Sequence, residues 1–156
     1  MFDWQYFDVT HALHTLYNPT SPARVDELGR LLELGPETRL LDIGSGAGEM
    51  LIRWHEQHGI SGVGVDLSPP FIERAERRTA ARAPAADIRF VHAAGEAFQT
   101  DERYDVVMCV GASWIWTGYV GTLHGLRRFA RPGGVLVVGE PYWIAEPPEE
   151  YLAAEG

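Results

Sequence analysis

The sequence has little cysteine and no long apolar run. Its single cysteine, Cys109, lies inside the apolar segment 106–110, so the chain can form neither an internal disulfide nor a multi-cysteine metal site. No apolar stretch approaches the length of about 20 residues that crosses a bilayer. Residues 1–4 also lack the basic start of a signal peptide. We therefore expect a cytoplasmic protein with no metal centre and no membrane partner.

Positive charge is scarce as well. The chain has 13 Lys and Arg residues against 22 Asp and Glu residues, which leaves a formal net charge of −9. Because nucleic-acid binding depends on positive patches, this balance argues against a nucleic-acid partner and is compatible with a cationic ligand. The length of 156 residues fits a single domain, and the oligomeric state stays open.

Short apolar segments alternate with amphipathic segments along the chain. Buried strands are predicted at residues 39–43, 62–66, 88–91, 104–110 and 135–139. Ser21 and Pro22 predict a helix start, as an N-cap followed by proline at the first helical position. The predicted helix faces carry Val25, Leu28, Leu31 and Leu32, then Met50, Leu51 and Trp54, then Phe71, Ile72 and Ala75, then Val120, Leu123, Leu126 and Phe129. This alternation predicts an α/β fold with a doubly wound, mostly parallel sheet and helices on both faces.

A glycine-rich turn follows the first predicted strand. Asp42, Gly44, Gly46 and Gly48 form the pattern D-x-G-x-G-x-G at the junction with the next helix, where such sheets bind nucleotides. Glycine lets a ligand approach the backbone without meeting a Cβ atom, and the helix start favours an anionic group. A dinucleotide fingerprint needs its third glycine at position 49, which is Glu49. A purely structural turn is the alternative interpretation.

A second carboxylate follows the second predicted strand. Asp66 lies 22 positions after Gly44. A carboxylate at this place can accept hydrogen bonds from both hydroxyls of a ribose. The alternative is that Asp66 only caps the next helix, a role for which Ser68 is equally suited.

Over about residues 35–140, the chain resembles class I S-adenosylmethionine-dependent methyltransferases of the small-molecule type. The resemblance rests on these two motifs, on residues 104–107 and on the turn at residues 131–134. The resemblance implies a Rossmann-like fold, S-adenosylmethionine as cofactor, S-adenosylhomocysteine as product and a small-molecule methyl acceptor. It also implies a lid segment at residues 1–20, a cofactor-binding domain at residues 21–143 and a tail at residues 144–156. The cofactor-binding residues that it implies are Asp42, Gly44, Ser45, Gly46, Gly48, Asp66, Leu67, Ala94, Gly95, Glu96 and Val110.

Two departures from the family pattern affect these expectations. Many members have an acid after the third strand that contacts adenine, and the matching position here is Ala94. Adenine recognition is therefore expected at backbone groups or at Glu96. We also expect the antiparallel C-terminal hairpin of the family sheet to be missing, either because the chain is truncated or because this member lacks the hairpin. An uncovered edge strand is prone to aggregation, so we favour truncation or coverage of the edge by a partner.

Catalytic residues are not predicted. Weak candidates for a lid or a general base are His11, His14, Tyr17, Glu140 and Tyr142, and Trp114, Trp116 and Tyr119 either enclose the acceptor or pack on the next helix. Two other functions stay open: a non-catalytic domain that binds the cofactor, and a nicotinamide-dependent oxidoreductase. Glu49 argues against the second.

Overall fold

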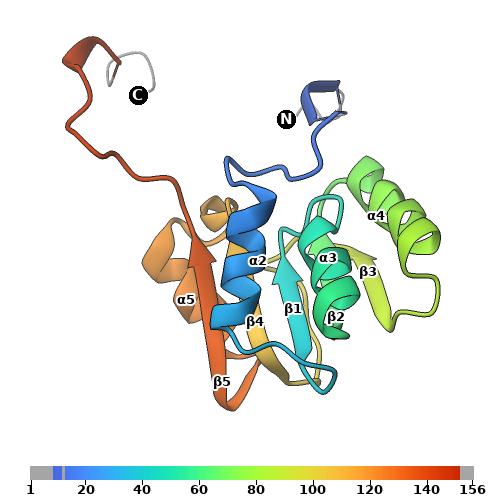
Figure 1. The fold of residues 1–156 in the computed structure, drawn as a ribbon. Coiled ribbons are helices and arrows are strands. Elements are labelled where there is room, and N and C mark those ends of the chain that lie inside the picture. Colours follow the sequence, from blue (N-terminus) through green and yellow to red (C-terminus); the bar gives the residue numbers. More distant parts are fainter. Residues whose placement is uncertain (1–8, 12, 152–156) are drawn as a thin grey trace.

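The computed structural model describes residues 9–11 and 13–151. Its strands are all parallel and form one sheet in the order β3-β2-β1-β4-β5 (Figure 1). They are β1 (Arg39–Ile43), β2 (Ser61–Asp66), β3 (Ile88–His92), β4 (Tyr104–Val110) and β5 (Ala130–Gly139). The strand order reverses between β1 and β4, and ligands of such sheets bind beside this point at the carboxyl ends of the strands. The predicted doubly wound α/β fold is confirmed.

Helices cover both faces of the sheet. They are α2 (Pro22–Leu31), α3 (Glu49–His58), α4 (Pro69–Arg82) and α5 (Tyr119–Arg127), with a short 3-10 helix, η1 (Ser113–Trp116). Neighbouring strand residues point to opposite faces, so Leu40 packs in one core cluster with Val25 and Trp54, whereas Leu41 packs in another with Leu126. Helices α2 and α3 therefore lie on one face of the sheet and α5 on the other.

Helix α2 starts as predicted, but fewer of its side chains are buried than the sequence pattern predicts. The Ser21 hydroxyl accepts a hydrogen bond from the Arg24 amide at 3.3 Å, and proline occupies the first turn. Leu31, which is expected on the buried face, is 75% exposed and is the last residue of the helix. Val25 of the same predicted face is buried, as expected, and its carbonyl accepts a hydrogen bond from the Trp54 indole at 3.0 Å.

Two further expectations need correction near the C-terminal part of the sheet. Val120 is exposed rather than buried, and Phe129 lies beyond the end of α5, although it is buried. The fifth strand begins at Ala130 and not at Val135. Tyr104 pairs with Ala130 and Val106 pairs with Val135, so the predicted turn at residues 131–134 is an irregularity within the strand pairing.

Strand β5 lies at one edge of the sheet. Within the described residues, the segment 140–151 forms no strand and the sheet contains no antiparallel pair. In the same part of the chain, no helix combines the length and the hydropathy needed to span a membrane.

Candidate cofactor site

A cavity of about 240 Å³ lies at the carboxyl ends of β1, β2 and β4. The structure places nine of the eleven residues predicted for cofactor binding on its wall. They are Asp42, Gly44, Ser45, Gly46, Asp66, Leu67, Gly95, Glu96 and Val110. Gly48 and Ala94 do not line the cavity. Residues 15–18 of the N-terminal segment complete the wall.

The glycines of the turn serve two different purposes. Gly46 has a φ of +54°, and a Cβ atom on it would lie 2.9 Å from the ring of Tyr17, so the position needs glycine for conformation and for space. Gly48 has a φ of +72°, and a Cβ atom there would lie 2.5 Å from the Phe90 ring. Gly48 therefore permits the start of α3 to approach β3, a packing role that the sequence motif does not distinguish from ligand binding.

Asp66 connects the glycine turn to the start of α4. One carboxylate oxygen accepts the Gly46 amide at 2.8 Å, and the other accepts the Ser68 amide at 2.8 Å. Ser68 is the N-cap residue, but its hydroxyl is buried and makes no hydrogen bond in the structure. Each carboxylate oxygen has two lone pairs, so Asp66 retains acceptor capacity for a ligand. Burial raises the pKa of Asp66, and the two amide hydrogen bonds partly oppose this effect.

The cavity is acidic. Asp42 is 3% exposed, and burial, with a smaller contribution from the charge of Asp66, raises its pKa to about 8. Glu49 is also buried and pairs with Arg82 at 2.6 Å. Glu96 is the fourth acid on the wall, and among the described lining residues there is no arginine or lysine. Asp42 stays protonated below about pH 8 and Glu49 is ion-paired with Arg82, so the preference of the wall for a cationic ligand rests on Asp66 and Glu96. The lack of arginine and lysine among the described lining residues disfavours the pyrophosphate of a nicotinamide cofactor.

Sequence reasoning missed part of the wall. Asn18, Phe71 and Ile115 line the cavity, and the Asn18 side chain lies where a Cβ atom on Gly111 would be. Gly111 follows β4 directly and has a φ of +73°, so this glycine was a signal of close approach.

The weaker candidates for a lid, an acceptor site or a general base lie partly on the cavity wall and partly away from it. His11, Tyr17 and Trp114 line the cavity. Trp116 and Tyr119 do not, and the Trp116 ring lies against Gly125 of α5. The three candidate bases, His14, Glu140 and Tyr142, are not on the wall, and Glu140 instead accepts the Ser113 amide at 2.9 Å.

Comparison with known proteins identifies the family. Residues 40–134 match the methyltransferase domain family. The chain belongs to this family. The resemblance to class I S-adenosylmethionine-dependent methyltransferases is therefore confirmed.

Similar proteins share the fold over most of this methyltransferase domain. The crystal structure of an S-adenosylmethionine-dependent methyltransferase from Thiobacillus denitrificans in complex with S-adenosylhomocysteine is 42% identical, with a TM-score of 0.91 over 99% of this chain and 62% of that one. The uncharacterized protein YjhP of Escherichia coli is 39% identical over 94% of this chain and 59% of its own. The 27-O-demethylrifamycin SV methyltransferase of Amycolatopsis mediterranei is 30% identical over 78% of this chain and 45% of its own. The methyltransferase domain thus spans less than two thirds of each relative.

The residues around the cavity fit the cofactor that this family uses, S-adenosylmethionine. Gly44, Ser45 and Gly46 of the glycine turn line the cavity, and Asp66 retains acceptor capacity beside them. The acidic wall suits a ligand that carries a sulfonium and an ammonium group.

Proposed function

We propose that this methyltransferase domain binds S-adenosylmethionine in the cavity and transfers its methyl group to a small organic acceptor. The observation that carries the proposal is the wall of the cavity, where the Asp66 carboxylate lies beside the glycine turn and no arginine or lysine occurs among the described lining residues. S-adenosylmethionine supplies a methyl group that is already activated on a sulfonium. The domain then has to align the acceptor and exclude water, and these tasks require no catalytic side chain common to all such enzymes.

Individual wall residues have distinct proposed roles. Asp66 accepts the ribose hydroxyls with the lone pairs left by Gly46 and Ser68. The backbone of residues 44–46 and the carboxyl group of Asp42 hold the methionine portion. Because Ala94 does not line the cavity, adenine recognition is assigned to the neighbouring Gly95 and Glu96.

The surroundings of the cavity favour a small acceptor over a polyanion. Trp114 lines the cavity and is still 57% exposed, so it offers an aromatic surface at the mouth. The arginines of α4 nearest the cavity are engaged: Arg74 donates to the Tyr17 hydroxyl, Arg78 to backbone carbonyls and Arg82 to Glu49. A nucleic-acid backbone would need cations that are available to its phosphates.

A transfer assay with S-adenosylmethionine labelled on the methyl group tests this proposal. We expect label in small aromatic, amine or hydroxyl acceptors and none in total RNA or in protein. Label only in RNA or protein would overturn the proposed acceptor class. Binding of S-adenosylhomocysteine without transfer to any acceptor would favour the non-catalytic alternative, and binding of NAD alone would overturn the cofactor.

A pair of tryptophan variants locates the acceptor. Trp114→Ala should raise the KM for the acceptor while leaving the affinity for S-adenosylhomocysteine unchanged. Trp143→Ala is the matched control, because Trp143 is similarly exposed and does not line the cavity. Equal effects of both variants would remove Trp114 from the acceptor site.

A further inference from the structure

The strap, residues 14–18, crosses one side of the cavity without regular secondary structure. Four of its members line the cavity: Thr15, Leu16, Tyr17 and Asn18. No helix or strand is assigned between residue 14 and residue 20. The strap therefore lacks the repeating backbone hydrogen bonds that hold a helix or a strand in place, and its position depends on contacts with other elements.

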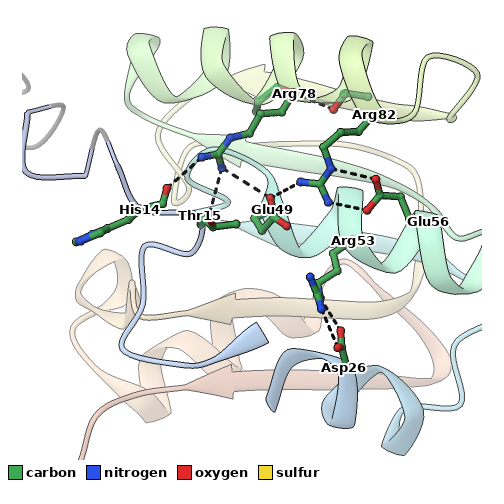
Figure 2. Close-up of polar contacts among 10 residues, drawn as sticks. His14, Thr15, Asp26, Glu49, Arg53, Glu56, Arg78 and Arg82 are labelled. Carbon is green, nitrogen blue, oxygen red and sulfur yellow. Dashed lines mark hydrogen bonds and ion pairs between the residues drawn. The ribbon is translucent and has the colours of Figure 1, made fainter. Parts of the chain in front are cut away.

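Arg78 of α4 makes two hydrogen bonds with the strap backbone. Its guanidinium donates to the carbonyl of Thr15 at 3.1 Å and to the carbonyl of His14 at 3.0 Å. The same group lies 3.9 Å from the carboxylate of Glu49, which lines the cavity. Figure 2 shows Arg78 between the strap and Glu49. A guanidinium can serve these acceptors together because it presents five donors in a planar fork.

The strap side chain nearest the glycine turn is held by the same helix face. Arg74 donates to the Tyr17 hydroxyl, and the guanidinium carbons of Arg74 and Arg78 each lie 6.0 Å from the centre of the Tyr17 ring. The ring also packs on Phe71 with 4.7 Å between centroids. Residues 71, 74 and 78 follow at helical spacing, so one face of α4 seats Tyr17 against Gly46.

We propose that Arg78 is a positioning residue that holds the strap over the cofactor cavity and thereby sets how long the cofactor and its product remain bound. The proposal rests on the cofactor site proposed above. A strap that is already seated loses little conformational entropy when a ligand binds, and it must be displaced before the ligand leaves. Loss of Arg78 should therefore act mainly on the dissociation rate.

The contacts of Glu49 make this proposal testable in a folded protein. Arg82 pairs with Glu49 at 2.6 Å and with Glu56 at 2.6 Å, as Figure 2 shows. Removal of Arg78 therefore leaves the buried carboxylate of Glu49 with its shorter ion pair. The variant should lose the strap contacts without creating an unpaired buried charge.

Stopped-flow dissociation of S-adenosylhomocysteine provides the test. Arg78→Met keeps an unbranched side chain and removes the donors. We expect dissociation to accelerate by roughly tenfold, less than the two lost hydrogen bonds would give directly, because they hold the strap and not the ligand. Arg77→Met is the matched control, because the Arg77 side chain is 67% exposed, against 22% for Arg78, and pairs with Glu73 at 3.7 Å. The control should release the product at the parent rate.

Two further measurements separate positioning from general stabilisation. Hydrogen exchange of the ligand-free protein should accelerate at residues 15–18 in Arg78→Met and not in Arg77→Met. The acceleration should exceed what any change in the free energy of unfolding in urea explains, with exchange in β1 and β4 as the internal reference. In a Tyr17→Ala background, Arg78→Met should change the dissociation rate less than it does in the parent. If Arg78→Met does not fold, Arg78→Lys, which keeps a cation but not the fork, carries the same comparison.

The outcomes are distinct. Dissociation and strap exchange at the parent rates in folded Arg78→Met would overturn the proposal. A parent protein that does not bind S-adenosylhomocysteine would instead refute the proposed cofactor site, while exchange at residues 15–18 would still report whether Arg78 holds the strap.

Discussion

Replacement of Asp66 by alanine tests the centre of the proposed site. The Asp66 carboxylate accepts the amides of Gly46 and Ser68, each at 2.8 Å. It therefore holds the glycine turn and the start of α4 in addition to its proposed bonds with the ribose. Asp66→Ala should weaken ligand binding directly, through the lost ribose contacts, and indirectly, through a displaced turn.

The expected size of the effect follows from these contacts. Hydrogen bonds to a charged group contribute about 1.5–3 kcal/mol, which corresponds to a loss of affinity of roughly 10- to 150-fold. Stability should also fall, because two amides lose their acceptor. Burial raises the pKa of Asp66, so removal of this carboxylate also relieves a desolvation cost, and we expect a net loss of only about 1–3 kcal/mol.

Calorimetric titration with S-adenosylhomocysteine measures the affinity, and urea unfolding of the same samples measures the stability. Asp105→Ala is the matched control, since Asp105 accepts the Arg39 amide at 2.7 Å and bonds Arg131 near the amino-terminal ends of the strands, away from the cavity. The control should lose stability and keep its affinity. An unchanged affinity in folded Asp66→Ala would reduce Asp66 to a structural cap and refute its role in binding.

Two other predictions concern the same wall. Gly46→Val should abolish binding of S-adenosylhomocysteine, because a side chain at a φ of +54° costs about 1–2 kcal/mol and displaces Tyr17. Gly35→Ala is the control and should keep the parent affinity, because its Cβ atom meets nothing within 4 Å. Circular dichroism of the same samples checks that both variants are folded. Equal binding by folded Gly46→Val would show that the turn does not contact the ligand. Burial raises the pKa of the Asp42 carboxyl group to about 8 from its ordinary value of 3.8, so its contribution to stability is lost progressively as the pH rises between these values. In urea titrations, the free energy of unfolding of Asp42→Asn should therefore fall less than that of the parent between about pH 5 and pH 8. If the two free energies fell with the same slope against pH, the buried neutral carboxyl group would be contradicted.

Much of the fold was predictable because its signals are local and periodic. The apolar segments at residues 39–43 and 104–110 match β1 and β4, and Ser21 with Pro22 marks the start of α2. Exposure was less predictable, as Leu31 and Val120 show. An apolar residue at helical spacing is buried only if a neighbouring element covers that turn, and the sequence of the helix does not contain this information.

The sequence by itself determined the glycine turn at the end of β1 and the placement of Asp66 at the end of β2, since strand, turn and helix follow from neighbouring residues. Only the tertiary structure decided which glycine serves packing, because the partner of Gly48 is Phe90 on a distant strand. It also decided that the strap is seated on α4. Arg78 binds the strap through the carbonyls of His14 and Thr15, and every residue has a carbonyl, so no residue type marks such an acceptor in a sequence. The chain path that brings residues 14 and 78 together arises from the packing of α4 beside the cavity.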